Sequence, residues 1–72
     1  MKSIKPKDII VGDVIGHRDK EMVLKVKEIV SASGRTTFYG TDMADGTKSA
    51  YSSDDRLVPR LSRFVLIERR SD

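Results

Sequence analysis

Few side chains in this 72-residue chain could carry out covalent chemistry. Cysteine is absent, and the single histidine, His17, stands beside Arg18 with no recognisable triad around it. Asp54 and Asp55 lie in a serine-rich stretch, where helix capping or an Asx-turn accounts for them. The glycines are scattered and form no phosphate loop, and the acids lack the spacing of a calcium loop. The sequence therefore predicts a binding protein rather than an enzyme, with no metal or other cofactor.

A cluster of arginines surrounds Pro59. Arg56, Arg60 and Arg63 are expected in an exposed connection, where guanidinium groups bind phosphate oxygens in pairs or anchor a protein interface. A third interpretation is that they are solvated charges that protect the aggregation-prone strand Phe64-Val65-Leu66-Ile67. The sequence does not favour any of the three.

Two tyrosines fall on neighbouring predicted strands. If Ala44-Asp45-Gly46 is a three-residue hairpin loop with Gly46 in the left-handed region, Tyr39 lies opposite Tyr51. A two-residue loop would instead set Tyr51 against Gly40, and a four-residue loop would set it against Phe38. The expected register is that of the three-residue loop, with Tyr39 opposite Tyr51.

In that register the two tyrosines share a solvent-facing surface of threonine and serine. Such a pair is a stacking platform for nucleic-acid bases when cations flank it, and Lys25 and Lys27 are the nearest candidates in the preceding segment. The simpler interpretation, which is favoured, is that Tyr39 and Tyr51 only stabilise the hairpin.

Charge is unevenly distributed along the chain. The middle, residues 36–55, holds four aspartates against Lys48, whereas residues 56–70 hold five arginines against Glu68. The first seven residues carry cations only, Lys2, Lys5 and Lys7. Basic ends of this kind indicate an anionic partner, although a net charge of +3 also suits an ordinary soluble surface.

Alternating apolar residues and turn signals predict an all-β domain. The expected strands are 14–17, 21–33, 35–42, 47–53 and 63–69, with Gly12-Asp13 as the turn before the first and one short helical turn near 54–58. Residues 21–33 also fit a helical period. Their β-branched residues and a β-bulge near Lys27-Glu28 favour a strand.

Five short strands joined by tight turns indicate a small barrel, with residues 1–72 as a single domain. A closed sheet has no exposed edges. The apolar positions expected in its core are Ile10, Val14, Met22, Leu24, Val26, Ile29, Phe38, Leu57, Phe64 and Leu66.

The opening Asp8-Ile9-Ile10-Val11-Gly12-Asp13-Val14-Ile15, followed by a bent apolar strand, resembles the start of SH3-like small barrels, including KOW-type modules. The stretch Asp55-Arg56-Leu57-Val58 before the last strand is similar too. The glycine-rich run of KOW modules is replaced here by Lys20-Glu21-Met22-Val23. The resemblance implies the fold and leaves the function open, because SH3-like barrels have many functions.

Two functions follow as expectations. The first is a small basic module that contacts nucleic-acid phosphates. The second is a protein-interaction module, such as a phage-type accessory or inhibitory subunit that docks on a larger protein. The longest apolar run is far too short to cross a bilayer, and the lysine-containing start lacks the apolar segment of a secretory signal. A cytoplasmic location is the expected one.

Overall fold

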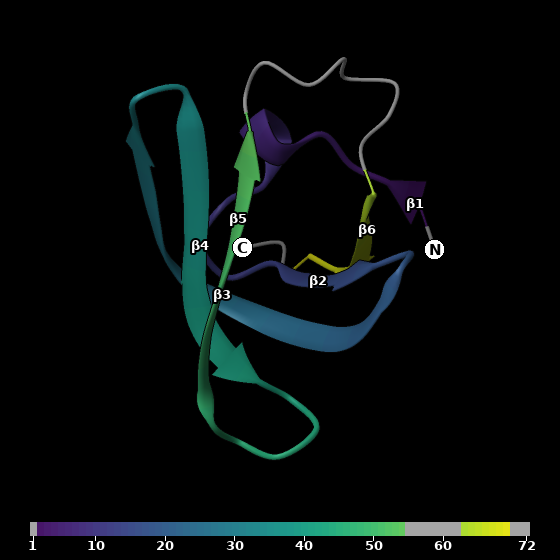
Figure 1. The fold of residues 1–72 in the computed structure, drawn as a ribbon. Helices are drawn as coiled ribbons and strands as arrows, with labels where there is room; N and C mark the ends of the chain where they lie inside the picture. The colour runs from purple at the N-terminus through teal and green to yellow at the C-terminus, as the bar shows by residue number, and fades with distance from the viewer. Residues whose placement is uncertain (1, 55–62, 70–72) are drawn as a thin grey trace.

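The computed structural model describes residues 2–54 and 63–69. Its strands form one antiparallel sheet in the order β1-β6-β2-β3-β4-β5 (Figure 1). Their bounds are β1 Lys2–Ser3, β2 Val14–His17, β3 Lys20–Ala32, β4 Arg35–Asp42, β5 Lys48–Asp54 and β6 Phe64–Glu68, with a 3-10 helix η1 at Pro6–Asp8. The mostly β class predicted from the sequence is confirmed.

The segment with two competing periodicities is a strand. Met22, Leu24 and Val26 alternate into the core along β3, as the strand period requires. The pairing with β4 shifts between Val26 and Glu28, which is the bulge expected near Lys27. The β-branched residues of this segment therefore predicted its conformation correctly.

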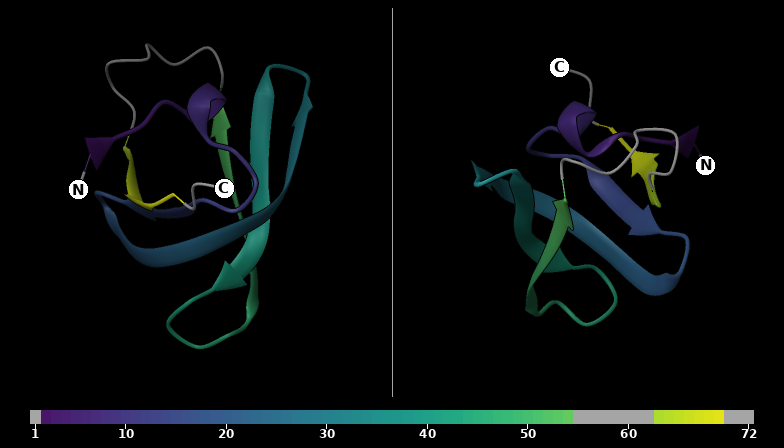
Figure 2. Two further views of the ribbon diagram at one scale, coloured as in Figure 1. Left: turned by 180° about the vertical axis from the view of Figure 1, so that it is seen from behind. Right: turned by 45° about the horizontal axis from the view of Figure 1, so that its top comes forward.

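The sheet bends at β3, which is shared by its two halves. The first part of β3 pairs with β2, the second part pairs with β4, and the two halves cross at a steep angle (Figures 1 and 2). Both halves contribute to the core, with Ile15 from β2 and Phe38 from β4. Gly40 lies at this bend, opposite Val26. A Cβ atom at Gly40 would be 1.9 Å from the carbonyl oxygen of Lys25, so only glycine allows β3 and β4 to approach this closely.

The described residues form six strands where five were expected in the whole chain. The additional strand, β1, is only two residues long and pairs with β6, so no local pattern could indicate it. Within residues 2–54 and 63–69, β1 and β5 are the two edges of the sheet and no ladder joins them. Closure into a barrel is therefore not shown, and the helical turn expected near 54–58 lies outside the described residues.

The core contains most of the apolar residues expected there. Met22, Leu24, Val26, Phe38 and Phe64 are buried, and Ile29 and Leu66 pack against them at its border. Leu57 lies outside the described residues.

Two core expectations are wrong, because the chain enters β2 one residue out of the expected phase. Ile10 is 50% exposed, and Ile9 is buried in its place. Val14 is half-buried on the opposite face of β2, opposite the exposed Lys25, while Ile15 is fully buried.

The β4–β5 hairpin has a four-residue loop. The N–H of Asp42 donates to the carbonyl oxygen of Thr47, and Gly46 has φ +75° as predicted. The carboxylate of Asp45 accepts from both the backbone N–H and the hydroxyl of Thr47. These bonds hold Asp42 opposite Thr47, so the expected pairing of Met43 with Thr47 is wrong.

Candidate nucleic-acid interface

The longer loop places Tyr39 and Tyr51 on opposite faces of the sheet. Phe38 lies opposite Tyr51, and Tyr39 lies opposite Ala50. Because side chains alternate along a strand, a shift of one residue moves a whole set to the other face. The predicted Tyr39–Tyr51 pair is therefore wrong, and the register with Tyr51 against Phe38 is the correct alternative.

Tyr51 belongs to the inner face. Its ring packs against the border of the core, and the ammonium group of Lys20 lies 5.9 Å from the ring centroid. That arrangement is a cation–π contact which stabilises the fold. Tyr51 therefore has a contact within the fold, and it does not share a face of the sheet with Tyr39.

Tyr39 is on the outer face and is 43% exposed. The neighbouring row of the same face runs from Lys25 through Thr41 to Lys48, all exposed or half-buried. Diagonal neighbours of this kind lie about 7–8 Å apart, within reach of long side chains. Lys48 is therefore a diagonal neighbour of Tyr39, Lys25 lies in the same row beyond the β-bulge, and Glu28 lies directly opposite Tyr39. Lys27 is exposed at the bulge.

The arginine cluster around Pro59 is described at one position. Arg63 precedes β6 and is exposed, with its Nε 3.4 Å from a carboxylate oxygen of Asp19. Arg56 and Arg60 lie outside the described residues. Arg63 is therefore partly neutralised by a neighbour, and the expected cluster is not tested.

A basic cleft lies beside the N-terminal segment. The sequence indicated only that this segment is basic. Pro6 begins η1. The segment before it runs beside the first half of β6, through β1 and Ile4, and Asp8 reaches Arg69 just after the end of β6 (Figure 1). The cleft measures ≈ 660 Å³ and is lined by Lys2, Ser3, Ile4, Lys5, Lys7, Asp8, Ile10, Leu66 and Arg69. Its cations come from both ends of the chain, which is why no local motif revealed it.

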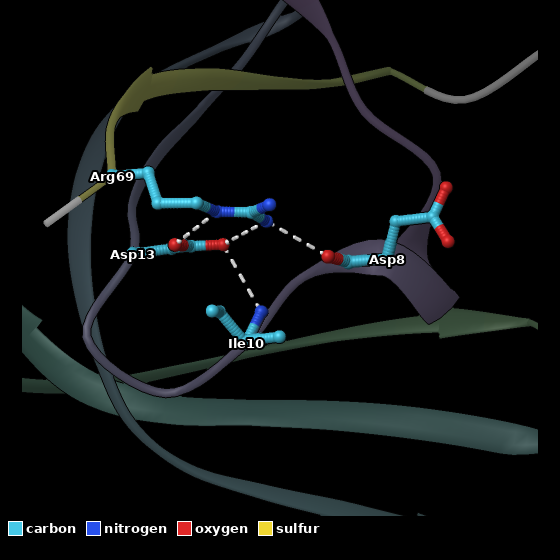
Figure 3. Close-up of polar contacts among 4 residues, drawn as sticks. All are labelled: Asp8, Ile10, Asp13 and Arg69. Atoms are coloured by element: carbon cyan, nitrogen blue, oxygen red, sulfur yellow. Dashed lines mark hydrogen bonds and ion pairs between the residues drawn. The ribbon is translucent and has the colours of Figure 1, made fainter. Parts of the chain in front are cut away.

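Arg69 is held at the edge of this cleft by Asp13 (Figure 3). Its Nε and Nη2 donate to the two carboxylate oxygens of Asp13 at 2.9 and 2.8 Å, and Nη2 also donates to the carbonyl oxygen of Asp8. The backbone N–H of Ile10 donates to the same carboxylate at 3.0 Å. Two oxygens thus receive three hydrogen bonds, which satisfies a carboxylate that is almost fully buried.

The pKa of Asp13 reflects this environment. Burial by itself raises the pKa of the carboxyl group, but the hydrogen bonds from Arg69 and Ile10 and the charge of Arg69 together outweigh it. The net pKa of Asp13 lies below its ordinary value, so the group is ionised at neutral pH. An ionised and fully paired Asp13 is a structural anchor for Arg69.

His17 is also explained by local structure. Its Nδ1 accepts the N–H of Asp19, and its ring meets Phe64 edge to face. Burial lowers the pKa of the imidazole, which favours the neutral form. Across residues 2–54 and 63–69, no group of three His, Cys, Asp or Glu side chains could hold a metal ion, and no helix is long and apolar enough to span a bilayer.

Comparisons with protein-family models, with curated proteins and with solved structures found no match to this chain.

Proposed function

We propose that this chain is a small binding module, of the SH3-like barrel type, whose N-terminal cleft contacts the phosphates of a nucleic acid. The observation that carries the proposal is the position of Lys2, Lys5 and Lys7 around one open cleft. Ammonium groups attract phosphate as point charges without a fixed geometry. A cytoplasmic location is part of the same proposal.

Contact with phosphates, rather than reading of bases, suits the charges of this cleft. The lysine side chains are exposed. The guanidinium of Arg69, in contrast, already binds the carboxylate of Asp13, so it attracts a further anion less strongly. The carboxylate of Asp8 lies in the same cleft and opposes an anion. The three lysines therefore supply the attraction, and phosphate contacts position a nucleic acid without selecting its sequence.

The surface around Tyr39 supports an additional contact with single strands. An exposed ring with Lys25 and Lys48 in the adjacent row can stack on a base while the lysines approach the backbone. Duplexes keep their bases paired and stacked, so Tyr39 would contribute little to duplex binding.

A salt series with DNA and RNA tests the proposal. For three phosphates neutralised, log K should fall with log salt with a slope of roughly −2 to −3 on duplex DNA. Replacing Lys2, Lys5 and Lys7 together by glutamine should flatten this slope and weaken all sequences alike.

The matched control removes the same charge elsewhere, with Lys25, Lys27 and Lys48 replaced by glutamine. It should leave duplex binding closer to the parent than the first triple variant does. Equal effects of the two triple variants would show that net charge, and not the cleft, drives binding.

Docking on a larger protein is the second candidate function. Ile10 and Val11 are 50% and 59% exposed at the turn before β2, and Ile10 also lines the basic cleft. Exposed apolar residues beside lysines suit an acidic protein surface with an apolar centre. If the intact chain binds neither nucleic acid at low salt, this candidate replaces the first, and Ile10→Ser should then speed the dissociation of a captured partner.

A further inference from the structure

Two large apolar side chains are exposed next to each other at the turn before β2. Ile10 is 50% exposed and Val11 is 59% exposed. A single exposed apolar residue is ordinary on a protein surface. This pair differs because its members are adjacent in the sequence, and because Ile10 lines the same cleft as Lys2, Lys5 and Lys7.

The turn that carries the pair is held in place by its backbone and by one buried side chain. The N–H of Asp13 donates to the carbonyl oxygen of Ile10 at 3.1 Å, and Gly12 has φ +99°, as the third position of a type II turn requires. The N–H of Ile10 donates in return to the carboxylate of Asp13, which Arg69 also binds (Figure 3). The N–H of Gly12 donates to β3. The exposed position of Ile10 and Val11 is therefore built into the fold.

The lysines beside the turn narrow the kind of surface that it fits. Lys7 lies in η1 and Lys5 directly precedes it, so both cations stand close to Ile10 in the same cleft. In duplex DNA, phosphates border each groove, and apolar surface lies between the stacked bases. Cations beside an exposed apolar turn match this arrangement, because the lysines can contact phosphates while the turn reaches the base pairs.

We propose that the turn Ile10–Asp13 is an apolar wedge that enters the minor groove of duplex DNA, separates two stacked base pairs and bends the duplex. The inference rests on the proposed contact between the cleft and phosphates, and it names the preferred ligand, a duplex that unstacks easily. Minor-groove proteins insert isoleucine and similar residues between base steps in this way. Such a wedge makes no hydrogen bond to a base edge, so it selects deformable DNA rather than a base sequence.

The first experiment compares two duplexes of equal length, one fully paired and one with a central mismatch. The parent chain should bind the mismatched duplex at least about tenfold more tightly, because less stacking must be broken there. Ile10→Ser and Val11→Ser should each lose most of this preference and keep the salt dependence that the lysines produce. Circular dichroism checks that every variant is folded.

Two control variants separate the wedge from other causes of the same preference. Met43 is 54% exposed and follows β4, outside the cleft, so Met43→Ser should keep the preference. Tyr39→Ala should keep it too, which excludes stacking of an unpaired base on that ring. Loss of the preference in either control, or its survival in both Ile10→Ser and Val11→Ser, would overturn the wedge.

Energy transfer between dyes at the two ends of the fully paired duplex measures bending directly. Wedges of this kind kink DNA by about 20–90°, so the saturated parent complex should bring the ends closer, and the Ile10→Ser complex should do so less. A duplex that is bound with the expected salt slope but is neither bent nor preferred when mismatched would overturn the wedge and leave the phosphate contact standing. If the parent binds no duplex even at low salt, the phosphate contact is wrong, and the wedge is wrong with it.

Discussion

Arg69 and Asp13 form a two-bond ion pair between residues 56 positions apart in the sequence. The pair joins the end of β6 to the turn before β2. The same turn bonds to β3, because Gly12 donates to the carbonyl of Val26 and Val26 donates to the carbonyl of Asp13. Asp13 is 1% exposed, whereas the side chain of Arg69 is 39% exposed. Loss of the Arg69 side chain would leave a buried charge without its partner, whereas loss of the Asp13 carboxylate would leave a half-exposed one.

Arg69→Met should destabilise the protein more than Asp13→Asn does. Methionine leaves a buried carboxylate with only the N–H of Ile10 as its donor, and an unpaired buried charge is costly. An asparagine oxygen at the Oδ2 position keeps the bonds from the N–H of Ile10 and from Nη2 of Arg69, and only the negative charge and the bond from Nε are lost. Asp13→Asn should therefore cost about 1–2 kcal/mol. Urea unfolding at neutral pH measures both. A larger loss for Asp13→Asn would show that the carboxylate is not buried as described.

Acid should destabilise the fold in two windows. The pKa of His17 is lowered by burial, so the unfolded state binds a proton first and stability falls as the pH drops below about 6.5. The pKa of Asp13 is also lowered, because its hydrogen bonds and the charge of Arg69 outweigh burial. Stability from Asp13 is complete above its unfolded pKa of about 3.9 and is lost as the pH falls through the folded value.

Urea midpoints across pH 3–8 check both windows. His17→Asn should remove the upper window and leave the lower one. In Arg69→Met the lower window should reverse, because burial then raises the pKa of Asp13 and acid relieves an unpaired charge. An unchanged acid profile in Arg69→Met would show that other carboxyl groups dominate.

Gly40→Ala should cost about 2 kcal/mol or more, since its Cβ would be placed 1.9 Å from the carbonyl oxygen of Lys25 and the backbone of β3 would have to move. Gly46→Ala is the matched control. No atom lies within 4 Å of its Cβ position, and only the φ of +75° is unfavourable, which should cost about 1 kcal/mol. Thermal melting measures both variants, and a lower melting temperature for Gly46→Ala than for Gly40→Ala would contradict the prediction.

Substitution of Tyr51 should mainly affect stability, and substitution of Tyr39 should mainly affect binding. Tyr51→Ala removes a half-buried ring at the border of the core and should cost about 1–3 kcal/mol of unfolding free energy. Tyr39→Ala should change stability by less than about 0.5 kcal/mol. If the outer face binds single strands, Tyr39→Ala should weaken that binding by about 1–3 kcal/mol and spare duplex binding. Titration of single-stranded and duplex DNA with the folded variants measures the difference.

Local patterns in the sequence determined much of the fold. The β-branched residues of β3 predicted a strand with a bulge at Lys27, and the alternation of Met22, Leu24 and Val26 predicted which face is buried. Gly46 was predicted in the left-handed region, because the Asp-Gly turn requires it. These features depend on residues close together in the chain, so the sequence alone carried the information.

Pairing and phase were decided by the tertiary structure. One extra residue in the β4–β5 loop placed Tyr51 on the inner face of the sheet and Tyr39 on the outer face, since strand side chains alternate with a period of two. Whether Ile9 or Ile10 enters the core depends on how η1 leads into β2.

The same holds for the candidate site. The lysines of the N-terminal segment meet Arg69 only because β1 and β2 both pair with β6, across almost the whole chain. The sequence determined that the ends are basic, and the folded sheet decided that they form one surface. Contacts between distant residues depend on every turn between them, so no local pattern specifies them.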